Sequence, residues 1–394
     1  MISRDGKSLR VLMISPQFQP IVGGYERAAE RLSAALAGAG LGVVVITERR
    51  DRAWPARERI DGYDVQRLSC VYRPRRHILT SLFSFAGFLL RRGREFDVWH
   101  VHQYGVHAAL SVALGKILRR PVALKLTSTA PMGIERAMGS GVVGRILRFF
   151  HRRVSACIAI SDETRTEALQ FGVTPGRIQL IPNGVDSRQF YPASPDERAA
   201  ARRKLGLDCE LLVLCVGRLV QPKNQAGLLE AWGAIDARIR DGSLLALVGD
   251  GPDWKELNRR AQGPDLAGSV YFAGSRSDVA IWYQAADVYV LSSHREGLSN
   301  TMIEALASGL PVISTPVSGS SILVESPPAG LVVDFGDVGM LARAMQCLMQ
   351  DASMRKRLGE NARVKFESSF SLEGLLEKII SLYKGLRDRN ARQT

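Results

Sequence analysis

The sequence contains few cysteines, and none of them stands at metal-ligand spacing. Five are spread over 394 residues without a Cys-x-x-Cys pair or a Cys/His cluster. Sparse thiols of this kind are typical of a reducing compartment, and they argue against a disulfide framework and a cysteine-based zinc site. We therefore expect no metal ion and no other cofactor.

Long apolar runs are missing as well. The longest uncharged apolar stretch covers residues 78–90, or 13 residues, whereas a helix needs about 20 to span a bilayer. The first residues lead into an apolar strand pattern at 9–15 without the apolar region of a signal peptide. These absences predict a cytoplasmic location and no membrane-spanning segment.

The glycine pattern of dinucleotide-binding enzymes is also absent. The loop at residues 20–24 follows the first predicted strand and precedes a helix, but it does not read Gly-x-Gly-x-x-Gly. Glycines at this place still allow the backbone to approach a phosphate closely, and the helix N-terminus supplies N–H groups. Gly23 and Gly24 are therefore candidate donor-binding residues, and a tight strand-to-helix turn is the alternative.

Acidic residues are scarce in one half of the chain. Residues 1–190 hold 29 Lys and Arg against 15 Asp and Glu, whereas residues 191–394 hold 24 of each kind. Residues 66–160 alone carry 16 basic and 3 acidic side chains. Such asymmetry indicates an anionic partner for the first half, which could be membrane lipid, a phosphorylated acceptor or nucleic acid.

Strand-like and helix-like segments alternate along the whole chain, which predicts parallel sheets joined by right-handed crossovers. The length exceeds that of one ordinary core and favours two domains. Turn-forming residues gather after Pro182, and a second series of strands begins at Leu211. We therefore predict two Rossmann-like α/β domains, residues 1–187 and 188–370, followed by a helical segment at residues 371–394.

Residues 287–315 carry the densest set of candidate site residues. An apolar strand at 288–291 opens into a polar turn, and a helix follows it. Glu296 lies in the turn, and Glu304 lies one turn inside the helix. Between them, backbone N–H groups at the helix start can bind an anion; they belong to Leu298, Ser299, Asn300 and Thr301. The arrangement suits a ligand with a central phosphate and hydroxyl-bearing rings on both sides, such as a nucleotide sugar.

Two cations follow the first strand of the second half. Arg218 and Lys223 stand in a Gly-Arg-x4-Lys sequence. A guanidinium can bind a phosphate with two hydrogen bonds, and an ammonium acts as a point charge. Together they could stabilise the negative charge that develops on a departing diphosphate. Gly249 and Gly251 stand in a Gly-x-Gly-Pro turn after the next strand.

These segments resemble, in the same order along the chain, motifs of the retaining glycosyltransferases of family 4. The pair Glu296 and Glu304 is similar to the E-x7-E signature of that family, and Arg218 with Lys223 is similar to its Gly-Arg-x4-Lys element. The resemblance covers nearly the whole chain. It implies the GT-B fold, in which two Rossmann-like domains with parallel sheets face each other across a cleft and the last helix returns to the N-terminal domain.

The resemblance also implies a reaction that needs no metal ion. A nucleotide-sugar donor would bind the C-terminal domain, where Arg218 and Lys223 contact its diphosphate. Glu296 would bind the sugar hydroxyls and Glu304 the ribose, because a carboxylate can accept two hydrogen bonds from a vicinal diol. The acceptor, a lipid-linked compound or a glycan of bacterial envelope or exopolysaccharide assembly, would bind the N-terminal domain. The turn glycines that would lie near the nucleotide are Gly249 and Gly251.

One position departs from the family pattern. The family often carries His in the strand-end segment that here covers residues 123–129, and the matching residue is Leu126. The neighbours that could take over its contact with sugar and acceptor are Lys125, Thr127 and Ser128. His100 and His102 match another common strand motif of the family, and we expect structural roles for them because strand alternation buries side chains.

Two basic and apolar segments lie in the first half. Residues 78–90 are apolar between basic flanks, and residues 145–153 repeat the theme. The flanking arginines include Arg75, Arg76, Arg91 and Arg92. Such segments can lie in the headgroup layer of an anionic membrane, which predicts peripheral attachment; the alternative is two core helices with solvated ends. Stacking aromatics do not interleave with the basic residues, so nucleic acid is disfavoured as a partner.

Two other functions stay open at this point. A GT-B nucleotide-sugar epimerase would share the architecture, but it should need acid and base residues in the cleft and would not require two cations at this spacing. A non-catalytic basic protein of the membrane surface could keep a transferase scaffold. Four intact residues argue against such decay, namely Arg218, Lys223, Glu296 and Glu304.

Overall fold

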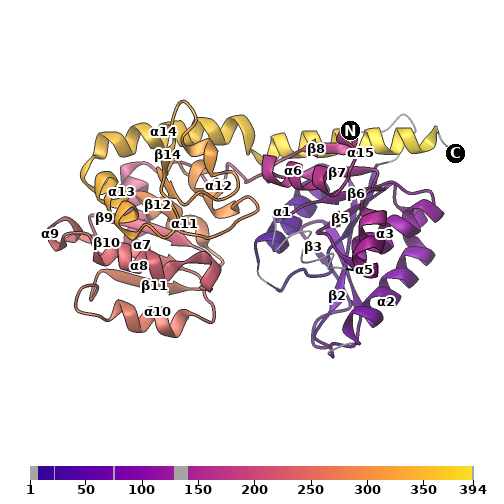
Figure 1. Cartoon of the computed structure of the whole chain (residues 1–394), viewed down its shortest axis with the longest axis horizontal. Helices are drawn as coiled ribbons and strands as arrows, with labels where there is room; N and C mark the ends of the chain where they lie inside the picture. Colours follow the sequence, from indigo (N-terminus) through magenta and orange to yellow (C-terminus); the bar gives the residue numbers. More distant parts are fainter. Residues whose placement is uncertain (1–7, 22, 74–75, 128–140, 393–394) are drawn as a thin grey trace. The chain divides into compact units, whose positions relative to one another are not determined.

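The computed structural model describes residues 8–392 apart from residue 22, residues 74–75 and residues 128–140. Its contacts divide the chain into two compact units, which Figure 1 shows with their elements labelled. Unit 1 comprises residues 1–183 and 373–394, and unit 2 comprises residues 184–372. The division lies in the turn-rich connection that the sequence marked as a linker, and the last helix belongs by its contacts to unit 1.

Unit 1 is built on an eight-stranded sheet with the order β3-β4-β2-β1-β5-β6-β7-β8. Neighbouring strands run parallel except β3 and β4, which form an antiparallel hairpin. The strands are β1 (Arg10–Ile14), β2 (Gly42–Arg49), β3 (Arg57–Ile60), β4 (Tyr63–Ser69), β5 (Val98–His102), β6 (Val122–Lys125), β7 (Ala156–Ala159) and β8 (Ile178–Leu180). The sheet therefore has the parallel crossover topology that the alternating pattern predicts.

Strand β3 has no counterpart in the sequence prediction. Its residues alternate between exposed and half-buried and offer no apolar face. Asp61 and Gly62, which connect β3 to β4, have positive φ angles of 45° and 86°. A two-residue hairpin turn requires such angles, and an Asp-Gly pair supplies them at low cost. This dipeptide was the sequence signal for the hairpin.

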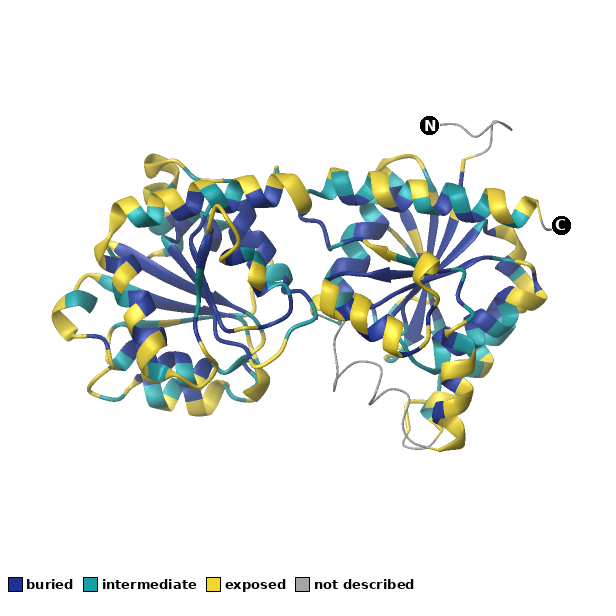
Figure 2. Ribbon diagram, turned by 45° about the horizontal axis from the view of Figure 1, so that its top comes forward, coloured by how far each residue is buried: buried dark blue, intermediate teal, exposed yellow. Residues whose placement is uncertain are grey.

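Helices cover both faces of the unit 1 sheet. The described ones are α1 (Gly24–Gly38), α2 (His77–Arg92), α3 (Val106–Ile117), α5 (Val142–His151), α6 (Asp162–Gln170) and α15 (Leu372–Ala391). Figure 2 shows the strands as buried and the outer helix faces as exposed. The side of the sheet under α2 and α3 contains a large apolar cluster that includes Trp99, Val101 and Leu124. Burial of such apolar surface is the main favourable term in folding.

Unit 2 has a six-stranded parallel sheet with the order β11-β10-β9-β12-β13-β14. Its strands are β9 (Leu211–Val216), β10 (Ser243–Val248), β11 (Val270–Gly274), β12 (Val288–Leu291), β13 (Val312–Ser314) and β14 (Gly330–Val332). The chain order reverses between the adjacent strands β9 and β12. Their carboxyl ends therefore form a topological switch point, which is where open α/β sheets bind ligands.

The helices of unit 2 alternate with these strands. They are α7 (Pro195–Leu205), α8 (Gln225–Gly233), α9 (Ala237–Arg240), α10 (Trp254–Ala261), α11 (Val279–Ala285), α12 (Asn300–Ala307), α13 (Val338–Gln350) and α14 (Ala352–Ser369), with a short 3-10 turn η3 (Gln221–Lys223) after β9. In neither unit is any described helix both long enough and apolar enough to cross a bilayer.

Candidate functional site

Two loops meet at the switch point of unit 2. Strand β9 leads into the loop with Arg218 and Lys223, and β12 leads into the loop with Glu296. The backbone N–H of His294 in the second loop donates to the carbonyl oxygen of Pro222 in the first, at 2.8 Å. Residues from two distant segments of the sequence therefore lie together at this edge of the sheet, as expected for parallel strands.

The central contact between these loops is an ion pair of Lys223 with Glu296. The Lys223 ammonium donates to one carboxylate oxygen of Glu296, and the Ser293 hydroxyl donates to the same oxygen at 2.8 Å. The two charged side chains are only 25% and 13% exposed, so solvent screens their attraction incompletely. Sequence reasoning assigned both residues to one ligand but did not predict their direct contact, and it missed Ser293.

Arg218 lies on the same loop with its side chain exposed. Its carbonyl oxygen accepts a hydrogen bond from the side-chain amide of Gln225 at 2.9 Å, which fixes the loop against α8. Among the residues that the structure describes, none forms an ion pair with the Arg218 guanidinium. A fixed backbone with an exposed cation can bring five N–H donors to an anionic ligand at the switch point.

Gly249 and Gly251 hold the β9 and β10 loops against each other. A Cβ on Gly249 would lie 2.0 Å from the carbonyl oxygen of Gly217, and one on Gly251 would lie 2.1 Å from that of Leu219. Gly249 also has a φ of 146°, which other residues rarely adopt. Any side chain here would separate the two loops. The structure thus shows a packing role for these glycines, and their contact with a nucleotide stays a prediction.

The start of α12 is capped by Ser299. The hydroxyl of the cap residue Ser299 accepts from the Met302 N–H at 3.3 Å, and the Ile303 N–H bonds to the Ser299 carbonyl oxygen at 3.1 Å. Backbone N–H groups before residue 302 therefore lie outside the helical hydrogen-bond ladder. They include the predicted ligand-binding groups of Leu298, Ser299, Asn300 and Thr301.

Glu304 is 2% exposed. The Tyr283 hydroxyl donates to its carboxylate at 3.0 Å and to the carbonyl oxygen of Thr301 at 3.1 Å. The Tyr289 hydroxyl donates to the Thr301 hydroxyl at 2.6 Å. These tyrosines hold the carboxylate and the first turn of α12 in fixed positions. They come from α11 and β12, and no sequence spacing links them to Glu304, so the sequence analysis missed them.

Tyr289 of β12 is buried beside the start of α12. Burial raises the pKa of Tyr289 well above its usual value, and the charges of Glu296 and Glu304 raise it further. Burial raises the pKa of the neighbouring Cys215 thiol to about 12, with Lys223 opposing and Glu296 adding to the effect. Lys223 and Glu296 are in direct contact. The Tyr289 hydroxyl donates to Thr301 in the first turn of α12, the helix that contains Glu304.

The glycine loop of unit 1 differs from the expected phosphate cradle. Helix α1 begins at Gly24, and its first turn contains Glu26, which is 4% exposed. A Cβ on Gly23 would lie 2.2 Å from the Glu26 carboxylate, whereas one on Gly24 would meet no atom within 4 Å. A carboxylate already lies beside this positively polarised helix end. Open space for a ligand exists at Gly24 rather than at Gly23.

Strand β6 of unit 1 ends at Lys125, which is completely buried beside His102 of β5. Its ammonium has no hydrogen-bond partner among the described residues, and burial lowers its pKa to about 8. His100 lies two residues before His102 on the same strand, β5. Its Nδ1 atom is 2.5 Å from the hydroxyl oxygen of Tyr383 on α15. Burial, reinforced by Lys125, lowers the pKa of His100 to about 3. The His100 contact agrees with a structural role.

The other residues of this strand end lie in different surroundings. Leu126 is buried in the apolar cluster under α2 and α3, so the side chain at the family's His position points into the core. Thr127 is half-buried, and its hydroxyl has no partner within the described residues. Ser128 lies outside the described residues. A role of Lys125 or Thr127 toward an acceptor stays a prediction.

The two basic and apolar segments form α2 and α5, and both expose apolar side chains. Phe83 on α2 is 77% exposed and Ile78 is 55% exposed. By helical spacing Ile78 shares a face with Phe85 and Leu89, but only the latter two are buried in the core, because Ile78 lies in the first turn of α2. The exposed apolar residues of α5 are Val142, Val143, Ile146 and Phe149.

The arginines at the ends of α2 differ in their exposure and in their partners. Arg76 and Arg91 are exposed. Arg92 donates two hydrogen bonds of 2.8 Å to Glu95 and lies 5.7 Å from the ring centroid of Phe88, so part of its charge is already compensated. Arg75 lies outside the described residues. Arg76 and Arg91 are therefore the better candidates for contact with an anionic surface.

One group in the described part of the chain has ligand atoms close enough for a metal ion, namely Glu48, Cys70 and His77, which lie within 4.8 Å of one another. The Glu48 carboxylate already accepts from Arg50 at 3.0 Å and from the Ser81 hydroxyl at 2.7 Å. A metal ion would have to displace a guanidinium there, and the group lies outside the switch point of unit 2.

Comparison with known families agrees with this geometry. Residues 22–189 match the family model "Glycosyltransferase Family 4", and residues 197–365 match "Glycosyl transferases group 1". The chain belongs to the group 1 glycosyltransferases. The solved structure of sucrose-phosphate synthase from Thermosynechococcus elongatus is similar over 96% of this chain and 99% of that one, with a TM-score of 0.79 and 26% identity. WaaG, a glycosyltransferase involved in lipopolysaccharide biosynthesis, is similar over 95% and 100%, with a TM-score of 0.75 and 19% identity. The predicted GT-B fold class is thereby confirmed.

Among curated relatives, this glycosyltransferase is 29% identical to the GDP-mannose-dependent monoacylated alpha-(1-6)-phosphatidylinositol monomannoside mannosyltransferase of Corynebacterium glutamicum, over 95% of this chain and 98% of that one. It is 28% identical to the lipopolysaccharide core biosynthesis mannosyltransferase LpsB of Rhizobium meliloti, over 75% and 81%. The prediction of a glycosyltransferase is confirmed. The roles of individual site residues are not tested by these similarities.

Proposed function

We propose that this glycosyltransferase moves a sugar from a nucleotide-diphosphate donor to a hydroxyl group of a lipid-linked or glycan acceptor, with retention of configuration and without a metal ion. The observation that supports this most is the contact of Lys223 with Glu296 at the switch point, in the loop that leads into the helix with Glu304. A cation, two carboxylates and a helix N-terminus lie together there, and a nucleotide sugar offers a complementary group for each.

In the proposed complex, the diphosphate lies against Lys223, Arg218 and the N–H groups at the start of α12. The ammonium has three donors, so it can keep one hydrogen bond to Glu296 while it binds a phosphate oxygen. The second carboxylate oxygen of Glu296 accepts from a sugar hydroxyl, and Glu304 accepts from the ribose. The Tyr283 hydroxyl keeps Glu304 oriented for this task.

The proposed reaction breaks the bond from the sugar C1 to the diphosphate oxygen. The acceptor oxygen forms its bond to C1 on the same face, and its proton passes to a phosphate oxygen. Lys223 and Arg218 stabilise the negative charge that grows on the leaving diphosphate. Glu296 is held by Lys223 and Ser293 and serves in binding, so no covalent sugar-enzyme intermediate is invoked.

The relatives favour a mannosyl donor. GDP-mannose stands in the name of the Corynebacterium glutamicum relative and of the Mycobacterium tuberculosis relative, which is 26% identical over 95% of this chain and 98% of that one. Both names describe transfer to a phosphatidylinositol mannoside, which is a membrane glycolipid. We therefore propose GDP-mannose as the donor and an envelope glycolipid or lipid-linked glycan as the acceptor.

A glycolipid acceptor would require the enzyme to work at a membrane surface. Helices α2, α3 and α5 lie side by side in unit 1 (Figure 1) and expose Phe83, Ile117 and Ile146. The exposed cations Arg76 and Arg91 flank α2. Apolar side chains ringed by cations favour the interface of an anionic bilayer. We propose that this surface attaches the enzyme peripherally to the cytoplasmic face of the plasma membrane.

A thermal-shift screen of nucleotide sugars tests the donor. A donor at 100 times its dissociation constant should stabilise the protein by about 2.7 kcal/mol, and we expect GDP-mannose to give the largest shift. Absence of any shift across GDP-, UDP- and ADP-sugars would refute the assigned site. NMR of the product should show the anomeric configuration of the donor, and activity should survive EDTA. An inverted product would refute retention, and activity lost in EDTA and restored by magnesium would refute metal independence.

A further inference from the structure

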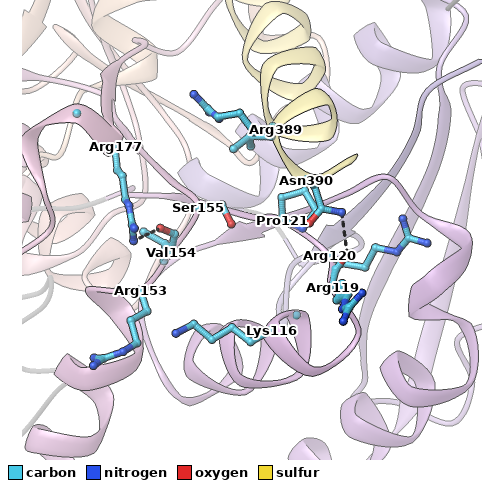
Figure 3. Close-up of a pocket in the computed structure, with 13 residues that line it drawn as sticks. Lys116, Arg119, Arg120, Pro121, Arg153, Val154, Ser155, Arg177, Arg389 and Asn390 are labelled. Atoms are coloured by element: carbon cyan, nitrogen blue, oxygen red, sulfur yellow. Dashed lines mark hydrogen bonds between the residues drawn. The ribbon is translucent and has the colours of Figure 1, made fainter. Parts of the chain in front are cut away.

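Unit 1 contains a second pocket that the reaction does not use. It has a volume of about 740 Å³ and lies where the chain enters β6, β7 and β8. These are the amino ends of the strands, whereas Lys125 and the glycine loop lie at the carboxyl ends. The residues around it come from the ends of α3 and α15, from the connections that follow α3 and α5, and from the turn that leads into β8 (Figure 3).

Six of the thirteen residues that line the pocket are cationic, and none of the thirteen is acidic. The six cations are Lys116, Arg119, Arg120, Arg153, Arg177 and Arg389. In Figure 3, Lys116 and Arg389 lie on opposite sides of Ser155, with Arg177 and Arg153 along one flank. No ion pair joins any of the six to a carboxylate within the described residues. So many facing cations favour an anion between them.

Helix ends explain only part of this charge. Three helices end at the pocket, and each carboxyl end carries about half a negative charge. Their sum of about 1.5 charges balances a quarter of the six cations. Arg120, Arg153 and Arg177 each donate one hydrogen bond to a backbone oxygen, at 2.8 to 3.2 Å. This leaves most of their N–H groups available.

The remaining polar atoms point to the same conclusion. Within the described residues, the side chains of Lys116, Arg119 and Arg389 form no hydrogen bond, and Nε of Arg120 is buried without a partner. The Ser155 hydroxyl accepts from the Val122 N–H at 3.1 Å, so its own proton can be donated. Burial, and then the charges of Arg153 and Arg177, lower the pKa of Lys116. An anion would relieve that repulsion.

We propose that this pocket, which we call the amino-edge pocket, binds a phosphate monoester or diphosphate. The ligand carries two or more negative charges, bonds the guanidinium groups in bidentate fashion and accepts from the Ser155 hydroxyl. The shared chemistry has two possible sources, a small free phosphate compound or the headgroup of a phosphomonoester lipid. The site is separate from the donor site in unit 2 and does not depend on the proposed function.

Two double variants that remove the same number of charges separate the effect of the pocket from that of overall charge. K116Q/R389Q removes two cations whose side chains form no hydrogen bond within the described residues, so the fold should persist. R52Q/R57Q removes two exposed cations near β3, at the other edge of the sheet, and serves as the control. Inorganic pyrophosphate is titrated into wild type and both variants by calorimetry. Hydrogen exchange of residues 115–121 and 386–391 separates the amino-edge pocket from the donor site.

A free phosphate ligand predicts that pyrophosphate protects both segments in wild type and control and binds at least about tenfold more weakly at this site in K116Q/R389Q. A lipid source predicts that the same segments are protected by phosphatidylcholine vesicles containing 10 mol% phosphatidic acid, but not by pyrophosphate or phosphatidylcholine alone. That protection should again be lost only in K116Q/R389Q. Equal weakening in both variants, or no protection by either probe, would overturn the proposal.

Discussion

The switch point of unit 2 joins two residues that the sequence placed 73 positions apart, because β9 and β12 are neighbours in the sheet. Lys223 has two tasks in this arrangement. It compensates the partly buried charge of Glu296, and in the proposed reaction it offers a cation to the departing diphosphate. A replacement of Lys223 that keeps the positive charge should therefore retain more activity than one that removes it.

Lys223→Ala should lower kcat at least about tenfold, the effect of losing about 1.4 kcal/mol of transition-state stabilisation. Lys223→Arg should retain more activity because it keeps a cation. Steady-state kinetics with saturating donor measure both. Lys255→Ala, which removes an exposed lysine of α10 in the same unit, is the matched control. An unchanged kcat in Lys223→Ala would contradict the assigned role.

Lys125 offers a test of buried charge in unit 1. Its pKa of about 8 in the folded protein lies below the ordinary lysine value of 10.5, so the unfolded chain holds the extra proton between these pH values. Stability should then rise with pH in this window, and the full penalty should apply below pH 8. His100 has a pKa of about 3 and does not titrate in this range.

We expect Lys125→Met to stabilise the protein by about 3 kcal/mol at pH 7 and by about half of that at pH 9.5. Urea unfolding at the two pH values measures the difference from wild type. Lys378→Met, at an exposed lysine of the same unit, should give no comparable gain. A gain that is the same at both pH values would show that packing of the methionine, and not the buried charge, is responsible.

For single residues, the sequence identified the charged candidates of the site but not the side chains that contact them. Arg218, Lys223, Glu296 and Glu304 stand in recognisable motifs, whereas Tyr283 of α11 reaches Glu304 of α12 only through the fold. The role of Gly23 was also unpredictable, since the side chain of Glu26 occupies the space beside it. Local spacing does not encode such contacts.

Among the elements, α2 shows why the exposed side of an apolar helix is hard to predict from its sequence. Ten of its sixteen residues are apolar or glycine, HILTSLFSFAGFLLRR, so periodicity alone does not single out one buried stripe. Only its neighbours decide that Phe85 and Leu89 enter the core and that Phe83 faces solvent. Burial of exposed aromatic surface in a lipid interface would then provide a favourable hydrophobic contribution.

A double variant F83S/I146S should lose most binding to vesicles that contain anionic lipid. Each removed methylene costs about 0.8 kcal/mol of interfacial burial, so a loss of at least tenfold is expected. Flotation with vesicles of varied anionic content at low salt measures the effect. Val364→Ser, at an exposed apolar residue of α14 in unit 2, is the control. Wild-type protein that ignores lipid charge, or a variant that floats as well as wild type, would remove the membrane assignment.

For the molecule as a whole, alternation and length predicted two α/β units and a linker in the right place. They could not show which residues belong to each unit, because unit 1 is completed by a helix from the far end of the chain. The family resemblance implied this return. Its physical basis is the stripe of Leu375, Ile379, Tyr383 and Leu386, which are all buried.

Removal of α15 should therefore unfold unit 1 although most of that unit lies earlier in the sequence. Burial of four such side chains contributes about 1.5 to 3 kcal/mol each, or roughly 6 to 12 in total, and a whole domain has only about 5 to 15 kcal/mol of stability. Truncation also leaves His100 without the Tyr383 hydroxyl. We expect a chain that ends at residue 371 to lose the cooperative unfolding transition of unit 1 in calorimetry, whereas a chain that ends at residue 391 keeps it. An intact transition in the shorter chain would mean that the unit 1 core is sufficient without its last helix.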